Sequence, residues 1–187
     1  MNNRILYDTK YLQLKSTTAK DGSDWVYAHR PNAKDVVVIV PVIERSKVLF
    51  LIEERPPLVS ENVALRSVAV PAGLVGDERK GESIEDAIKA ELIEEAGLVA
   101  DKIDIKTRRA VSSPGCVSES TTIAIAYIDK YVIEAEPISD GGVIVDRVLV
   151  DIDKLSTWLK DVEAKGYAIS ALTLAGLFYL IKDKEIK

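Results

Sequence analysis

The chain has 187 residues, 47% of them hydrophobic and 29% charged, and its formal net charge is −5. This length suits one buried core with at most a small appendage, and the composition excludes a disordered or fibrous protein. The negative charge argues against general nucleic-acid binding, because neutralising phosphates requires a surplus of Lys and Arg on one face.

The N-terminal residues lack the apolar core of a secretory signal, and no apolar run approaches the length that crosses a bilayer. Cys116 is the only cysteine, so an internal disulfide is impossible and the composition fits a reducing compartment. We therefore expect a cytoplasmic protein with no membrane partner.

The chain begins with a predicted β-hairpin region. Two extended segments flank residues 20–24 (KDGSD), whose composition is typical of a tight turn. A Pro-Asn-Ala-Lys break separates this hairpin from the β-branched run at 36–40, which predicts a strand covered on both faces. We therefore expect an N-terminal β-hairpin region at residues 1–34 and the main domain at 35–187.

Among the remaining elements strands outnumber helices and the two are mixed in order, which favours a compact α/β/α sandwich around a mixed sheet. The helix that carries the strongest signals spans residues 83–96, with Ser83 and Asp86 in a capping-box pattern and Gly97 as its stop. Further strands are expected at 47–54, 66–70, 103–111, 121–131 and 143–151, and further helices at 154–164 and 170–182.

Three glutamates lie on the unexpected side of the helix at 83–96. At about 100° per residue, Glu91, Glu94 and Glu95 fall within or beside the arc that the apolar side chains share. Buried carboxylates without partners are costly, and the sequence offers few cations to pair with these three. Glu91 and Glu95 are one turn apart and can reach a single point, which favours a Mg²⁺ or Mn²⁺ site. The alternative is an exposed last turn whose glutamates are simply solvated.

The neighbourhood of these glutamates resembles the Nudix box. Gly76, Glu82 and the segment ELIEEAGL at 91–98 have the order and spacing of that motif. One position departs from it, because Ala90 stands where the family has an arginine that pairs with and orients the glutamates. The motif implies a Nudix-type fold and a divalent-metal site on this helix.

A wider resemblance to ADP-ribose pyrophosphatases covers most of the chain. The segment PAGL at 71–74 is similar to the one in which these enzymes place the first glycine of the box, which makes Gly73 its equivalent at the substrate. Mg²⁺ is the implied cofactor, with Mn²⁺ as the alternative. The implied metal ligands are Glu82, Glu91, Glu95 and the carbonyl of Ala72.

The same resemblance implies contacts with the substrate. Tyr11 and Trp25 offer flat faces for adenine, and Arg30 and Arg55 can fork onto phosphate oxygens. Glu119 follows Pro-Gly in a loop whose glutamate serves catalysis in the family. The alternatives from the residues alone are aromatic side chains that pack on the core and an ordinary surface charge at Glu119.

The resemblance implies metal-dependent hydrolysis of the pyrophosphate bond of a nucleoside diphosphate sugar, with ADP-ribose cleaved to AMP and ribose 5-phosphate. Glu94, Glu95 and Glu119 are the expected catalytic residues, and a homodimer that exchanges its N-terminal hairpins is the expected assembly. One alternative is a UDP-glucose or GDP-mannose pyrophosphatase. Another is a sensor that binds ADP-ribose without cutting it, which the loss of the arginine at Ala90 motivates.

Overall fold

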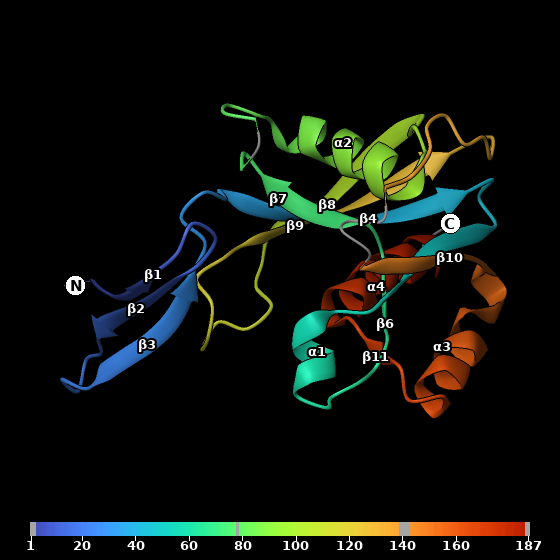
Figure 1. The fold of residues 1–187 in the computed structure, drawn as a ribbon. Helices are drawn as coiled ribbons and strands as arrows, with labels where there is room; N and C mark the ends of the chain where they lie inside the picture. Colours follow the sequence, from blue (N-terminus) through green and yellow to red (C-terminus); the bar gives the residue numbers. More distant parts are fainter. Residues whose placement is uncertain (1–2, 78, 139–142, 186–187) are drawn as a thin grey trace.

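The computed structural model describes residues 3–77, 79–138 and 143–185. Its larger sheet has eight strands in the order β11-β6-β5-β4-β9-β8, with β10 paired to β5 and β7 paired to β4 (Figure 1). The strands are β4 (Asp35–Ile43), β5 (Lys47–Glu53), β6 (Ser67–Ala69), β7 (Ala72–Val75), β8 (Lys102–Ala110), β9 (Thr121–Ile128), β10 (Ile144–Asp151) and β11 (Ala168–Ile169).

The sheet is mixed, as the sequence predicts. β4 runs parallel to β9, and β11 runs parallel to β6, whereas the other pairings are antiparallel. Two helices, α1 (Pro56–Ser60) and α2 (Ile84–Ala96), precede β8, and the 3₁₀ helix η1 (Ile152–Lys154), α3 (Leu155–Ala164) and α4 (Ala171–Glu185) lie in the C-terminal part. Among the described helices, none is long and apolar enough to cross a membrane.

Alternation along the central strand builds two hydrophobic cores. Val37 and Ile39 of β4 pack in the core beneath α2, whereas Val38 and Val40 pack in the core beneath α3 and α4. Figure 1 shows α2 on one side of the sheet and α3 and α4 on the other. The expectation of a strand buried on both faces, and of an α/β/α sandwich, is therefore confirmed.

A separate three-stranded antiparallel sheet stands beside the sandwich (Figure 1). It consists of β1 (Arg4–Asp8), β2 (Gln13–Thr18) and β3 (Asp24–His29). The hairpin of β2 and β3 is the one that the sequence predicts, and β1 is an addition to it. Every residue of β1 is exposed, so this strand lacks the alternation of buried and exposed side chains from which strands are predicted.

Two segments differ from the sequence-based prediction. Residues 72–75, for which no strand is predicted, form β7, which pairs with the first half of β4. The short helix α1 follows Arg55, where no helix is predicted. In both cases the structure depends on partners or backbone geometry that a local pattern does not contain.

Candidate functional site

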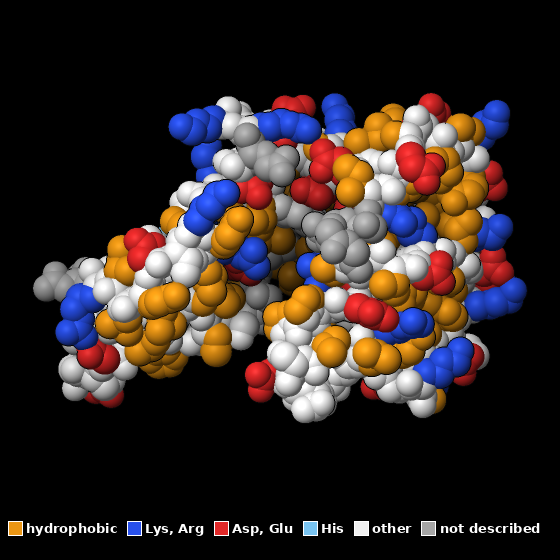
Figure 2. Space-filling view, in the orientation of Figure 1, with side chains coloured by type: hydrophobic (Ala, Val, Ile, Leu, Met, Phe, Trp, Pro, Cys, Tyr) orange, Lys and Arg blue, Asp and Glu red, His pale blue; other side chains and the backbone are white. Residues whose placement is uncertain are grey.

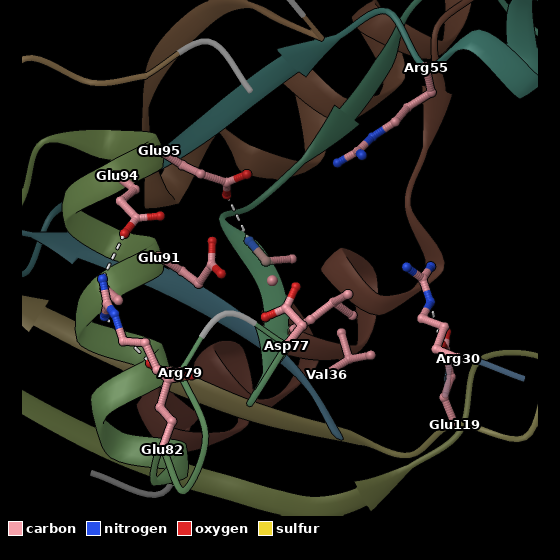
Figure 3. A pocket seen from close by; sticks show the side chains of 14 residues that line it. Arg30, Val36, Arg55, Asp77, Arg79, Glu82, Glu91, Glu94, Glu95 and Glu119 are labelled. Carbon is pink, nitrogen blue, oxygen red and sulfur yellow. Dashed lines mark hydrogen bonds and ion pairs between the residues drawn. The ribbon is translucent and has the colours of Figure 1, made fainter. Parts of the chain in front are cut away.

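The candidate site is a pocket of about 460 Å³ between α2, β7 and the neighbouring loops. Acidic side chains of α2 lie on one side of it and two arginines lie across from them (Figure 3). The pocket brings together nine of the residues singled out in the sequence, namely Arg30, Arg55, Ala72, Gly73, Glu82, Glu91, Glu94, Glu95 and Glu119. It also contains Asp77 and Arg79, which sequence analysis missed.

Helix α2 holds its glutamates in place because both of its ends are fixed. The Ser83 hydroxyl accepts a hydrogen bond from the Asp86 N–H at 3.1 Å, which completes the predicted N-terminal cap. Gly97 ends the helix in the left-handed conformation at φ 68°, which favours glycine. Ile88 and Leu92 on the inner face are fully buried. The helix therefore cannot rotate without exposing its apolar face.

Arg147 of β10 fixes the same helix end from the sheet. Its guanidinium donates to the carbonyl of Glu95 through Nε and to the carbonyl of Ile138, 2.7 Å away, through Nη2. The Glu134 N–H adds a hydrogen bond of 2.8 Å to the carbonyl of Gly97. Because the last carbonyls of a helix have no partners within it, these donors stabilise the turn that carries the glutamates.

Strand β7 lies directly against the acidic face of α2. The Ala72 N–H donates to the Glu95 carboxylate at 2.9 Å, and Glu95 is only 7% exposed. The Glu91 carboxylate lies over the backbone of Gly73 so closely that a methyl group at that position would overlap it. A glycine at position 73 therefore leaves space that the Glu91 side chain occupies.

The loop between β7 and α2 supplies a cation to the acidic cluster. Arg79 Nη1 lies 3.5 Å from Glu82 Oε1, and Nη2 lies 3.3 Å from Glu94 Oε1. The other oxygen of Glu82 accepts from the Gly76 N–H at 3.2 Å. Of the three glutamates singled out on α2, Arg79 therefore pairs with Glu94, and it does so from a loop in which the sequence pattern gives no signal.

Arg55 is oriented by a buried carboxylate that sequence analysis missed. Glu53 is only 4% exposed and accepts two hydrogen bonds from Arg55, at 3.0 Å from Nε and 2.6 Å from Nη2. Ser67 adds a hydrogen bond of 3.3 Å to Glu53. A charged residue at the end of the buried strand β5 was the available signal, because such residues are rarely buried unless they are paired.

Arg30 and Glu119 form an ion pair at the pocket's opposite side, with Nε 3.0 Å from Oε2 (Figure 3). The loop that carries Glu119 is attached to β3 by two backbone hydrogen bonds. The Ala28 N–H donates to the Cys116 carbonyl at 2.8 Å, and the Ser118 N–H donates to the Ala28 carbonyl at 3.1 Å. The loop that carries Glu119 is thus joined to the N-terminal sheet.

The two aromatic candidates lie outside the pocket formed by their own chain. Tyr11 is 74% exposed between β1 and β2, and Trp25 is 52% exposed on β3. The indole N–H of Trp25 donates to the Gly115 carbonyl at 2.9 Å, so this side chain contacts the same loop as Arg30. The structure of one chain therefore does not bring Tyr11 and Trp25 together with the glutamates.

His29 shares this loop contact. Its Nδ1 lies 2.9 Å from the Ser118 hydroxyl, and burial, followed by the positive charge of Lys15, lowers its pKa from the ordinary value. The side chain is therefore biased toward the neutral form. It does not line the pocket.

The donors in the pocket suit a hard divalent cation. Carboxylates on α2 and the backbone of β7 supply oxygen atoms, which Mg²⁺ and Mn²⁺ prefer. Within the described part of the chain, no three acidic, histidine or cysteine side chains already converge as a preformed metal site. The chemical type of the donors fits such an ion, with Glu91 and Glu95 nearest to β7.

The chain is similar to known proteins in sequence and in fold. No family model matches the chain. It is 20% identical over 187 residues to "Putative nudix hydrolase 2" of Caenorhabditis elegans, an alignment that covers 93% of this chain and 81% of the relative. A crystal structure of an ADP compounds hydrolase superposes with a TM-score of 0.72 at 19% identity, covering 97% of this chain and 91% of that one.

The fold is therefore of the Nudix type, with an acidic helix against a mixed sheet. Within that class, the similarity to an ADP compounds hydrolase extends over nearly the whole chain, including the N-terminal sheet. Both comparisons support the resemblance to Nudix hydrolases of the ADP-ribose pyrophosphatase kind that the sequence motifs carry.

Proposed function

We propose that this chain is a Nudix pyrophosphatase that hydrolyses a nucleoside diphosphate sugar, with ADP-ribose cleaved to AMP and ribose 5-phosphate. The observation that carries the proposal is the opposition of charges across one pocket, with the glutamates of α2 on one side and Arg30 and Arg55 on the other. A diphosphate fits between them because its oxygens accept from the arginines and share divalent cations with the carboxylates. The names of both relatives agree with this class of reaction.

The residues divide the work of the reaction. Glu91, Glu95 and the Ala72 carbonyl would hold the divalent cation, with Glu82 as an auxiliary ligand. Bound Mg²⁺ or Mn²⁺ would neutralise phosphate charge and make water a better nucleophile. Arg55 binds phosphate oxygens from a fixed position because the buried Glu53 already orients its guanidinium.

Glu119 is our candidate for the general base. Glu94 and Glu95 would assist it from the acidic wall, which is the side of the pocket formed by Glu91, Glu94 and Glu95 of α2. The Glu119 carboxylate is paired with Arg30 in the structure, and both groups line the pocket. A diphosphate that accepts from Arg30 competes with Glu119 for the same guanidinium. Substrate binding would thereby release a carboxylate at the place where an attacking water loses its proton.

Base recognition would require a second copy of the chain. Tyr11 and Trp25 lie outside the pocket of their own chain, on a sheet over which apolar side chains gather at the surface (Figure 2). An exposed apolar face of this kind is typical of a protein interface. We propose that residues 1–34 are exchanged in a homodimer and complete an adenine site across its two-fold axis, while residues 35–187 form the hydrolase domain.

A substrate panel tests the activity. Purified protein is incubated with Mg²⁺ or Mn²⁺ and with ADP-ribose, UDP-glucose or GDP-mannose. Phosphatase then hydrolyses the phosphomonoester products, and the inorganic phosphate that it releases is measured. We expect the highest kcat/KM for ADP-ribose and no turnover in EDTA. A higher kcat/KM for UDP-glucose or GDP-mannose would show that ADP-ribose is not the preferred substrate. Tight binding of ADP-ribose without turnover would favour a sensor that binds ADP-ribose without cutting it.

Light scattering tests the assembly separately. We expect twice the chain mass at micromolar concentration. A monomer that still hydrolyses ADP-ribose would contradict the shared adenine site and leave the pyrophosphatase proposal intact.

A further inference from the structure

We propose that Arg79 is a positioning residue for the acidic cluster, and that it supplies from a loop the cation that the helix lacks at Ala90. This inference deepens the proposed function and rests on it, because positioning matters only if the glutamates act on a ligand. It begins with one geometric fact. Arg79 contacts Glu82 of its own loop and Glu94 of α2 with the two terminal nitrogens of a single guanidinium.

The two carboxylates differ in how freely they can move. The side chain of Glu82 is 7% exposed and that of Glu94 is 36% exposed, whereas that of Arg79 is 58% exposed. Isolated ion pairs on a surface contribute little to stability, because water screens them. Arg79 instead reaches from solvent to a buried carboxylate and a half-buried one. The bridge is therefore better suited to fixing side-chain positions than to stabilising the fold.

The chemistry of the bridge favours arginine. A guanidinium is planar and has five N–H donors, so it can hold two carboxylates at once in a defined geometry. A lysine ammonium is a point charge on a flexible stem and does not impose a plane. Arg79 also closes a ring of contacts, because the Glu82 that it holds accepts from the Gly76 N–H at 3.2 Å. The guanidinium thus joins Glu82 of the loop to Glu94 of α2.

Ala90 explains why the loop can take this role. It lies one turn before Glu94 on α2, and it lines both the main pocket and an adjoining hollow together with Arg79, Glu82 and Glu94. A small side chain at this position leaves room above the helix for the arginine that comes from the loop. An arginine at position 90 would start from the helix and reach Glu94, one turn further on.

A set of four variants tests the inference, namely Arg79→Ala, Ala90→Arg, the double variant with both changes, and Lys80→Ala as the matched control. Lys80 is an exposed cation in the same loop that forms no ion pair with another described residue. For Arg79→Ala we expect kcat for the best nucleotide sugar to fall about tenfold or more, with KM within about threefold of the wild type. We expect Lys80→Ala to stay near the wild type, and we expect the double variant to recover most of the activity lost in Arg79→Ala.

Hydrogen–deuterium exchange of the metal-free protein supplies a readout that does not depend on turnover. We expect the amides of the loop from Gly76 to Glu82 to exchange faster in Arg79→Ala and to regain protection in the double variant. Circular dichroism and the Tm check that each variant folds. Arg79→Lys keeps the charge with poorer geometry, and we expect it to fall between the wild type and Arg79→Ala in both measurements.

Several outcomes would overturn the inference. They are an unchanged kcat in Arg79→Ala, a rise in KM at constant kcat, an equal loss in Lys80→Ala, and a double variant without rescue. A rise in KM alone would assign Arg79 to substrate binding instead. If the wild type cleaves no nucleotide sugar, the proposed function fails, while the exchange measurement still decides whether Arg79 holds the loop against the helix.

Discussion

The acidic wall on α2 and the N-terminal sheet represent two ways of building a site. The wall belongs to a helix that is capped at Ser83 and Gly97 and is buried along its inner face. The sheet has one strand, β1, that is exposed throughout, and it presents Tyr11 and Trp25 to solvent. The difference teaches that the core holds the carboxylates of α2, whereas Tyr11 and Trp25 lie exposed on a sheet beside it.

The largest effect is expected at the acidic wall. Glu95→Gln keeps a carbonyl oxygen that can accept from the Ala72 N–H but removes the charge, so the fold should persist while kcat falls about 10²- to 10³-fold. The measurement is kcat at saturating Mg²⁺ and ADP-ribose. Glu85→Gln is the control on the same helix, because Glu85 pairs with Arg108 outside the pocket. A wild-type kcat in Glu95→Gln would remove the wall from the mechanism.

Gly73→Ala should test the position of the Glu91 carboxylate without removing its charge. The added methyl group overlaps the Glu91 carboxylate, which can swing away because it ends a flexible side chain. We expect kcat to fall about 10- to 100-fold with little change in Tm. In a Glu91→Ala background, the same substitution should have no further effect on kcat, because the group that it displaces is gone. An additional loss there would show that Gly73 contacts the substrate independently.

The N-terminal sheet should respond in a different kinetic constant. Trp25→Ala is expected to raise KM for ADP-ribose about tenfold, because a base stacked on an aromatic ring gains about 1–3 kcal/mol. Trp25→Phe keeps the flat ring and loses the hydrogen bond to the Gly115 carbonyl. Near-normal KM in Trp25→Phe would support stacking. An unchanged KM in Trp25→Ala would remove this residue from the adenine site.

The smallest effect concerns pH at the contact between β3 and the loop. Burial and Lys15 lower the pKa of His29, so the folded protein prefers the neutral ring. Its contribution to stability is fully present above the pKa of the unfolded chain, about 6.5, and is lost as pH falls through the lower folded value. Between pH 8 and pH 5 we expect the Tm of the wild type to drop by about a degree or two more than that of His29→Gln. Parallel Tm curves would contradict this.

The sequence predicts the parts of the molecule whose signals are local. The run at 36–40 is β-branched because β4 is buried on both faces, and α2 is bounded by a cap and a glycine that act within a few residues. The same local signals place Glu91 and Glu95 on the core side. The fold class and the composition of the acidic wall therefore follow from the sequence.

The contacts that the sequence does not predict join residues that are far apart in the chain. Residues 72–75 form a strand that pairs with β4, which lies about 35 positions earlier in the chain. Arg79 reaches Glu94, fifteen positions away, from a loop without periodicity. Sequence motifs also do not show that Tyr11 and Trp25 lie outside the pocket of their own chain.

The attachment of the Glu119 loop to β3 has a consequence for shortened forms of the protein. Removing residues 1–34 would take away the backbone of Ala28, which pairs with Cys116 and Ser118, and the guanidinium of Arg30. The loop that carries Glu119, the proposed general base, would then lose its hydrogen bonds to β3. A shortened form designed for catalysis must therefore retain the N-terminal sheet, even if recognition of adenine is not required.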